Sequence, residues 1–179
     1  MRTFLLLAVC LGLSIPVFAQ DAAPEDVASP EAIVAAVYAS IEREPGAQFD
    51  WDRFVSLYIP EASLLPNPEQ MSGEERVFSP RGYADFIDGV YESANYIGSP
   101  NDQGFSETEV NKVVHRFGDV ATVFSTYEKY YWGDDQMLGR GINSFQLVYR
   151  DGRWWIVSVA WDEETGAGPV PEPYMPSGD

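Results

Sequence analysis

The spacing of apolar residues changes once along this chain, and that change constrains the fold more than any other feature of the sequence. Between Ser29 and Tyr91, apolar side chains recur every three or four residues, which is the period of an α-helix. Between Phe105 and Glu164 they alternate, which is the period of a β-strand. Helices in the first half and strands in the second predict an α+β domain, in which helices cover one face of a curved sheet.

Three helices are predicted in the first half, and each begins at a capping residue. Ser29 and Ser79, each followed by a proline, are typical helix starts, because serine accepts a hydrogen bond from the first turn and proline fits the first helical position. Asp50 caps a shorter helix, which we expect to stop at Pro60. A brief strand is predicted over residues 62–66.

Two hairpins are predicted in the second half. Gly118-Asp119 and Asp151-Gly152 are two-residue turn sequences, and each stands between two runs of alternating polar and apolar residues. The expected architecture is therefore three N-terminal helices packed on a curved, antiparallel sheet of four to six strands.

The two ends of the chain are expected to lie outside this domain. Residues 1–19 have the charged start, the apolar run and the small-residue cleavage site of a signal peptide, so we expect export to the periplasm or secretion. Residues 20–28 are interpreted as a linker and residues 29–164 as the domain. Residues 165–179 are interpreted as a proline-rich, extended tail.

The composition excludes several kinds of partner. A net charge of −17 repels nucleic acid and anionic lipid, so we expect neither nucleic-acid binding nor membrane binding after signal cleavage. The single cysteine, Cys10, lies in the signal peptide, and no metal-binding or phosphate-binding motif is present. We therefore expect no metal and no cofactor.

The order of these segments resembles the SnoaL-like branch of the nuclear-transport-factor-2-like superfamily. The resemblance is carried by DWDRFVSLY, RFGDVATVFSTYE and RGINSFQLVYRDGRWWIVSVAWDEE, and it covers residues 29–164. It implies a cone, in which a bent sheet wraps around a long helix and a pocket opens at the wide end. Members include polyketide cyclases, isomerases, dehydratases, epoxide hydrolases and non-catalytic domains, so the fold does not specify the function. The Asp-Arg-Asp set of the epoxide hydrolases and the paired histidines of the dehydratases have no counterpart here.

The last hairpin divides its side chains between two apolar faces, and the resemblance places the Trp154 face inward. Burying one aromatic side chain contributes about 4–6 kcal/mol as an upper estimate, so the opposite face also needs a cover. A second copy of the chain is the first expected cover, and the proline-rich tail is the alternative. The residues expected in such a homodimer interface are Gln146, Val148, Trp155, Val157, Val159 and Trp161.

The helices and the inner sheet face are expected to line a pocket. Aromatic walls with a few polar groups suit a small apolar or aromatic ligand. An ordinary packed core with satisfied sheet hydrogen bonds would use the same residue types, so both interpretations stay open. The residues expected at the ligand are Tyr38, Trp51, Phe54, Phe86, Ser125, Tyr127, Asn143 and Ser158.

Three ionisable residues are candidates for acid–base chemistry. His115 lies near a hairpin tip, where a surface position is expected, and it is separated from Glu107 by about 26 Å of extended strand. Glu107 or Asp162, if buried at the pocket rim, can serve as an acid–base carboxylate. We therefore expect an exported domain that binds a small apolar or aromatic molecule. An acid–base enzyme of the cyclase, isomerase or dehydratase type and a non-catalytic dimerisation scaffold are the alternatives.

Overall fold

The computed structural model describes residues 21–66, 77–94 and 96–176. The predicted signal peptide, residues 1–19, lies outside the described residues. Among the helices of the described part, none is both long enough and apolar enough to cross a membrane.

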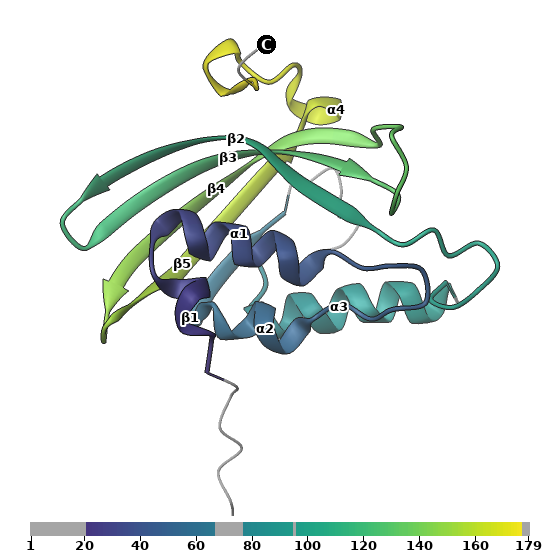
Figure 1. Cartoon of the computed structure of the whole chain (residues 1–179), viewed down its shortest axis with the longest axis horizontal. Coiled ribbons are helices and arrows are strands. Elements are labelled where there is room, and N and C mark those ends of the chain that lie inside the picture. Colours follow the sequence, from purple (N-terminus) through teal and green to yellow (C-terminus); the bar gives the residue numbers. More distant parts are fainter. Residues whose placement is uncertain (1–20, 67–76, 95, 177–179) are drawn as a thin grey trace, which may run out of the picture.

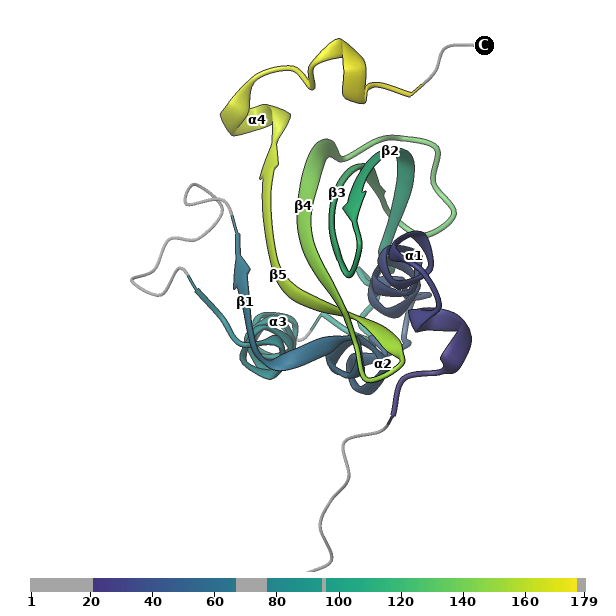
Figure 2. The ribbon, with the colours of Figure 1, turned by 90° about the vertical axis from the view of Figure 1, so that its left-hand side faces the viewer.

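A five-stranded sheet and a layer of helices make up the domain, which confirms the predicted α+β class. The strand order is β1-β5-β4-β3-β2, and the sheet curves, with the helices α1, α2 and α3 on one side of it (Figures 1 and 2). The helices are η1 (Pro24–Val27), α1 (Pro30–Ile41), α2 (Trp51–Ser56), α3 (Pro80–Ser93), α4 (Glu164–Ala167) and η2 (Glu172–Tyr174). The strands are β1 (Tyr58–Leu65), β2 (Ser106–Phe117), β3 (Val120–Tyr130), β4 (Gly139–Arg150) and β5 (Arg153–Glu163).

The three predicted caps are present. The side chains of Ser29, Asp50 and Ser79 each accept a hydrogen bond, at 3.1 Å, from the backbone N–H three residues further on. The second helix is shorter than predicted, because it ends at Ser56 and the chain continues directly into β1. Strand β1 runs parallel to β5, so the sheet is mixed, whereas all strands were expected to be antiparallel.

Both predicted hairpin turns are confirmed. Phe117 pairs with Val120 across the first turn, and Arg150 pairs with Arg153 across the second. In the second turn Asp151 and Gly152 have φ angles of 55° and 82°, the two positive values that a type I′ turn requires.

A β-bulge at Val157 changes the expected orientation of the end of β5. Leu147 pairs with Ile156 and Gln146 pairs with Ser158, so Val157 has no opposite residue in the ladder. One extra residue reverses the alternation of side chains beyond it. Trp155 therefore faces outward as predicted, but the predictions for Ser158, Val159 and Trp161 are wrong. Val159 and Trp161 face the helices, whereas Ser158 and Ala160 face outward.

The segments on either side of the domain are packed against it. Within the expected linker, Val27 joins the core and Asp26 forms an ion pair with Arg53 at 2.8 Å. The tail crosses the outer face of the sheet, opposite the helices (Figure 1). There the ring of Tyr174 stacks on Phe124 with centroids 5.4 Å apart. The alternative cover considered for the outer face, the tail, is thus present over β2 and β3.

Candidate functional site

A cavity of about 240 Å³ lies between the concave face of the sheet and the three helices. Its walls are mainly aromatic, and all five strands, α1, α3 and the segment around α2 contribute to them. Trp161 on β5 faces Tyr83 on α3 with ring centroids 5.5 Å apart, which closes one side. The lining residues are Val37, Ile41, Phe49, Trp51, Phe54, Tyr58, Leu64, Tyr83, Ile87, Tyr91, Phe105, Glu107, Tyr127, Lys129, Asn143, Phe145, Val159, Trp161 and Glu163.

The polar groups of the cavity gather at one end of the inner sheet face. Glu107 on β2 is the registered partner of Lys129 on β3, and Gly141 on β4 is paired with both Tyr127 and Glu163. Residues paired across a sheet project from the same face. Strands β2, β3 and β5 therefore bring a carboxyl group, an ammonium, a phenol and a second carboxyl group into one cluster, with Gly141 of β4 between them.

Glu107 has the most strongly perturbed carboxyl group in this cluster. Burial among aromatic rings raises its pKa to about 7, because the charged form loses its water. The positive charge of Lys129 and a hydrogen bond from Asn143 act in the opposite direction, whereas the carboxylate of Glu163 adds to the rise. The carboxyl group of Glu107 can therefore both accept and release a proton near neutral pH.

Glu163 is held in a fixed arrangement beside Glu107. The ammonium group of Lys129 forms an ion pair with Glu163 Oε1, and the hydroxyl of Tyr127 donates to the same oxygen at 3.2 Å. Burial and the nearby carboxylates raise the pKa of Tyr127, so its hydroxyl keeps its proton. An α-carbon substituent at Gly141 would stand 2.5 Å from Tyr127 Oη, which is why this position needs glycine.

Asn143 joins the cavity to a buried chain of hydrogen bonds. Its Nδ2 donates to Glu107 Oε1 at 3.4 Å and to the hydroxyl of Tyr38 at 3.1 Å. The Tyr38 hydroxyl lies 2.6 Å from Ser125 Oγ. The Ser125 hydroxyl in turn donates to Glu109 Oε1 at 2.6 Å. The chain thus links two carboxylates of β2 through α1, β3 and β4.

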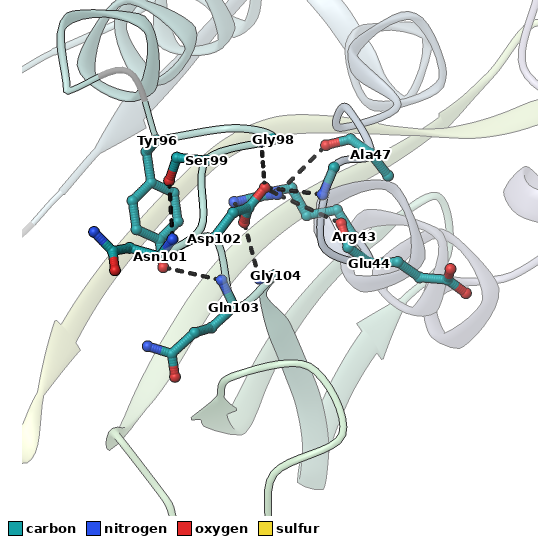
Figure 3. Close-up of polar contacts among 11 residues, drawn as sticks. Arg43, Glu44, Ala47, Tyr96, Gly98, Ser99, Asn101, Asp102, Gln103 and Gly104 are labelled. Carbon is teal, nitrogen blue, oxygen red and sulfur yellow. Dashed lines mark hydrogen bonds and ion pairs between the residues drawn. The ribbon is translucent and has the colours of Figure 1, made fainter.

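A buried ion pair supports another part of the cavity wall. The guanidinium of Arg43, at the end of α1, donates to both oxygens of Asp102 at 2.9 and 3.2 Å. The backbone N–H groups of Gly46, Gly98 and Gly104 also donate to this carboxylate, which Figure 3 shows enclosed between two loops. These bonds, with that of Arg43 the largest, lower the pKa of Asp102.

Aromatic rings surround the same guanidinium. Its central carbon lies 4.9 Å from the ring centre of Tyr91 and 5.3 Å from that of Phe49, within the range of cation–π attraction. Both rings line the cavity, and Phe105, which pairs through its backbone with Arg43, does so as well. The ion pair therefore positions the wall of the cavity without reaching into it.

The structure brings six of the eight predicted ligand residues to one region. Trp51, Phe54, Tyr127 and Asn143 line the cavity, and Tyr38 and Ser125 form the hydrogen-bond chain behind it. Two others are misplaced. Phe86 is 39% exposed and packs on Phe78, and Ser158 faces outward after the bulge.

The residues predicted at the dimer interface lie partly on the outer face of the sheet and partly in the cavity. Gln146, Val148 and Trp155 lie on the outer face, and Val157 is the bulged residue. Val159 and Trp161, in contrast, line the cavity.

Of the acid–base candidates, Glu107 lies in the cavity, whereas Asp162 and His115 are exposed. Lys129 and Glu163 were not among the residues predicted from the sequence. Strict alternation from the second turn places Glu163 with Trp155 on the outer face, so the missed bulge concealed it. Within residues 21–66, 77–94 and 96–176, no three His, Cys, Asp or Glu side chains are grouped to hold a metal ion.

The comparisons with known proteins identify the fold. No protein family and no curated protein matches the sequence. Among solved structures, a protein of unknown function with a cystatin-like fold from Nostoc punctiforme has a TM-score of 0.57 at 12% identity. The match covers 76% of this chain and 89% of that one.

Two further structures agree with this assignment. A nuclear-transport-factor-2-like protein of unknown function from Pseudomonas putida gives a TM-score of 0.54 at 11% identity, covering 74% of this chain and 82% of that one. A proposed scytalone dehydratase from Novosphingobium aromaticivorans gives 0.51 at 12% identity, covering 74% and 80%. The chain therefore has the nuclear-transport-factor-2-like, cystatin-like cone fold that the resemblance implied.

Proposed function

We propose that the cavity binds a small, largely apolar or aromatic molecule. The observation that carries this proposal is a cavity of about 240 Å³ with aromatic walls and its polar groups collected at one end. Such a site buries a flat ring against the walls and orients it through a few polar contacts. The polar end offers a carboxyl group at Glu107, an amide at Asn143 and an ammonium at Lys129.

A pair of tryptophans on β5 provides a test of this binding site. Trp161 lies in the cavity wall and Trp155 lies on the opposite face of the same strand. We expect Trp161→Ala to weaken binding of small aryl ketones and phenols at least tenfold in calorimetric titrations, because a large part of the contact area is lost. The matched variant Trp155→Ala should bind as the native protein does. Equal affinities in all three proteins would contradict the site.

A second function, acid–base catalysis on the bound molecule, is favoured by Glu107. A buried carboxyl group with a pKa of about 7 in an aromatic cavity can take a proton from a carbon next to a carbonyl group and return it. Asn143 lies beside this carboxyl, and the ion pair of Lys129 and Glu163 places further polar groups nearby. The proposed scytalone dehydratase among the structural matches shares only the fold.

Deuterium exchange tests this chemistry without a known substrate. We expect the native protein to catalyse exchange at the α-carbon of aryl ketones in heavy water, measured by proton NMR. Glu107→Gln should reduce the catalysed rate by about 10²–10⁴-fold while leaving ketone binding intact. Asp162→Asn, on the exposed side of β5, is the matched control. If the native protein binds the ketone but does not catalyse exchange, acid–base catalysis is contradicted and only the binding function stands.

Export remains part of the proposal. The support is the sequence of residues 1–19, with a charged start, an apolar run and a small-residue cleavage site. N-terminal sequencing of the protein after expression with its own leader should give a chain that begins at Gln20. A full-length chain that stays inside the cell would oppose export.

A further inference from the structure

The hydrogen bonds behind the cavity have one allowed direction, and Glu109 sets it. The ammonium group of Lys112 forms an ion pair with Glu109 Oε2, so this carboxylate accepts hydrogen bonds and donates none. Ser125 has one hydroxyl proton, and the 2.6 Å contact with Glu109 Oε1 requires it. Ser125 Oγ can therefore only accept from Tyr38.

The same logic extends to the cavity. The Tyr38 hydroxyl gives its single proton to Ser125, so it must accept from Asn143. Only the NH₂ group of the Asn143 amide can donate, which fixes this amide with its nitrogen toward Tyr38. The same nitrogen faces Glu107 Oε1 at 3.4 Å. The amide oxygen, which would favour a protonated Glu107, is turned away.

We propose that Ser125 and Tyr38 are positioning residues, which hold the Asn143 amide as a donor toward Glu107 and so favour the ionised form of that carboxyl group. Neither Ser125 nor Glu109 lines the cavity, and both act through Asn143. This positioning role rests on the proposed acid–base function, because it serves catalysis only if Glu107 transfers the proton. The orientation of Asn143 itself can be tested without any ligand.

Several other charged or titratable groups face Glu107, Tyr127 of β3 among them. Lys129 from β3 favours its ionised form, whereas Glu163 from β5 opposes it. Tyr83 from α3 and Tyr38 from α1 are also close enough to interact with this carboxyl. Replacing Ser125 changes none of these side chains. It removes the acceptor that determines the direction of the Tyr38 hydroxyl, together with the hydroxyl that donates to Glu109 Oε1.

Carboxyl-carbon NMR titration of the free, folded protein provides the test, with the Glu107 signal identified by its absence in Glu107→Gln. In Ser125→Ala, the Tyr38 proton is free to turn toward Asn143, whose amide can then present its oxygen to Glu107. We expect the titration midpoint of Glu107 to rise by about one pH unit, the effect of one hydrogen bond to a charged group. Tyr38→Phe removes the same constraint and should raise the midpoint in the same way.

The control removes a hydroxyl from the other face of β3. Thr122 Oγ1 donates to Gln146 on the outer face, so Thr122→Val should leave the midpoint of Glu107 unchanged. An unchanged or lowered midpoint in both Ser125→Ala and Tyr38→Phe would overturn the positioning role. Failure of the acid–base function would appear separately, as an absence of ketone exchange in the native protein, whatever the two variants do to the titration.

Discussion

The buried carboxyl of Glu107 couples the stability of the free protein to pH. Its pKa is about 7 in the folded state and 4.5 in the unfolded chain, so the folded protein binds more protons between these values. The contribution of Glu107 to stability is therefore present below about pH 4.5 and is lost as the pH rises through about 7. We expect Glu107→Gln to gain up to about 3 kcal/mol relative to the native protein across this range. Urea unfolding of both proteins at several pH values measures this gain, and parallel pH profiles would contradict it.

Two glycines of this chain should respond to alanine in opposite ways. A Cβ at Gly141 would lie 2.3 Å from the carbonyl oxygen of Asp162 and 2.5 Å from Tyr127 Oη, and a backbone atom cannot yield as a flexible side chain does. We expect Gly141→Ala to lower the free energy of unfolding by at least about 2 kcal/mol. Gly89 is exposed within α3 with nothing within 4 Å of a new Cβ. Gly89→Ala should therefore stabilise the protein by about 0.5–1 kcal/mol. If the denaturant midpoints of Gly141→Ala and Gly89→Ala shift in the same direction, the steric role of Gly141 is contradicted.

At the scale of elements, the ion pair of Arg43 and Asp102 joins the end of α1 to the loop before β2. Both side chains are buried, at 0% and 1% exposure. Replacing Asp102 with asparagine leaves the guanidinium without its counter-charge, so we expect a loss of about 3–5 kcal/mol in unfolding free energy. Asp52→Asn breaks the exposed pair with Arg81 and should cost less than about 1 kcal/mol.

The same ion pair predicts a response to acid. The pKa of Asp102 is lowered in the folded state, so its contribution is present above the unfolded pKa and is lost as the pH falls through the folded one. The stability difference between native protein and Asp102→Asn should therefore shrink on acidification. A difference that is constant with pH would show that the ion pair does not hold this loop.

Features that depend on only a few neighbouring residues, such as helix caps and tight turns, were predicted correctly from the sequence. Ser29, Asp50 and Ser79 cap their helices because each side chain needs only the N–H groups of the next turn. The turn at Asp151-Gly152 depends equally on local backbone angles. The parallel pairing of β1 with β5 could not be read in this way, because it joins segments far apart in the sequence.

The bulge at Val157 was missed for a different reason. From Trp154 to Trp161 the strand has apolar side chains on both of its faces, so a change in alternation leaves no break in the pattern. Trp51, Phe54 and Tyr127 were assigned to the cavity correctly, because they lie outside the bulged segment. Glu107 was considered as an acid–base group, but its neighbours Lys129 and Glu163 depend on the register of four strands.

At the scale of the whole molecule, the outer face of the sheet is only partly covered by the part of the chain that the structure describes. Thr126 Oγ1 donates to the carbonyl of Tyr174 at 2.7 Å, and Asn111 Nδ2 donates to that of Met175 at 2.9 Å. Toward the hairpin tips, Trp155 lies half-buried under the guanidinium of Arg153, which is 3.7 Å from its ring centre. The predicted homodimer would therefore meet a face that the tail already shares.

Removing the tail provides a test of that competition. Deleting residues 169–179 takes away Tyr174 and exposes the ring of Phe124, on the same outer face that carries the half-buried Trp155. Because a larger apolar area on one face favours association, we expect the truncated protein to dimerise at concentrations at which the full chain is monomeric, in sedimentation velocity experiments. Adding Trp155→Glu to the truncated protein places a charge on this surface and should restore the monomer. If truncation leaves the sedimentation coefficient unchanged except for the lost mass, the tail does not compete with a second copy, and the outer face does not drive self-association.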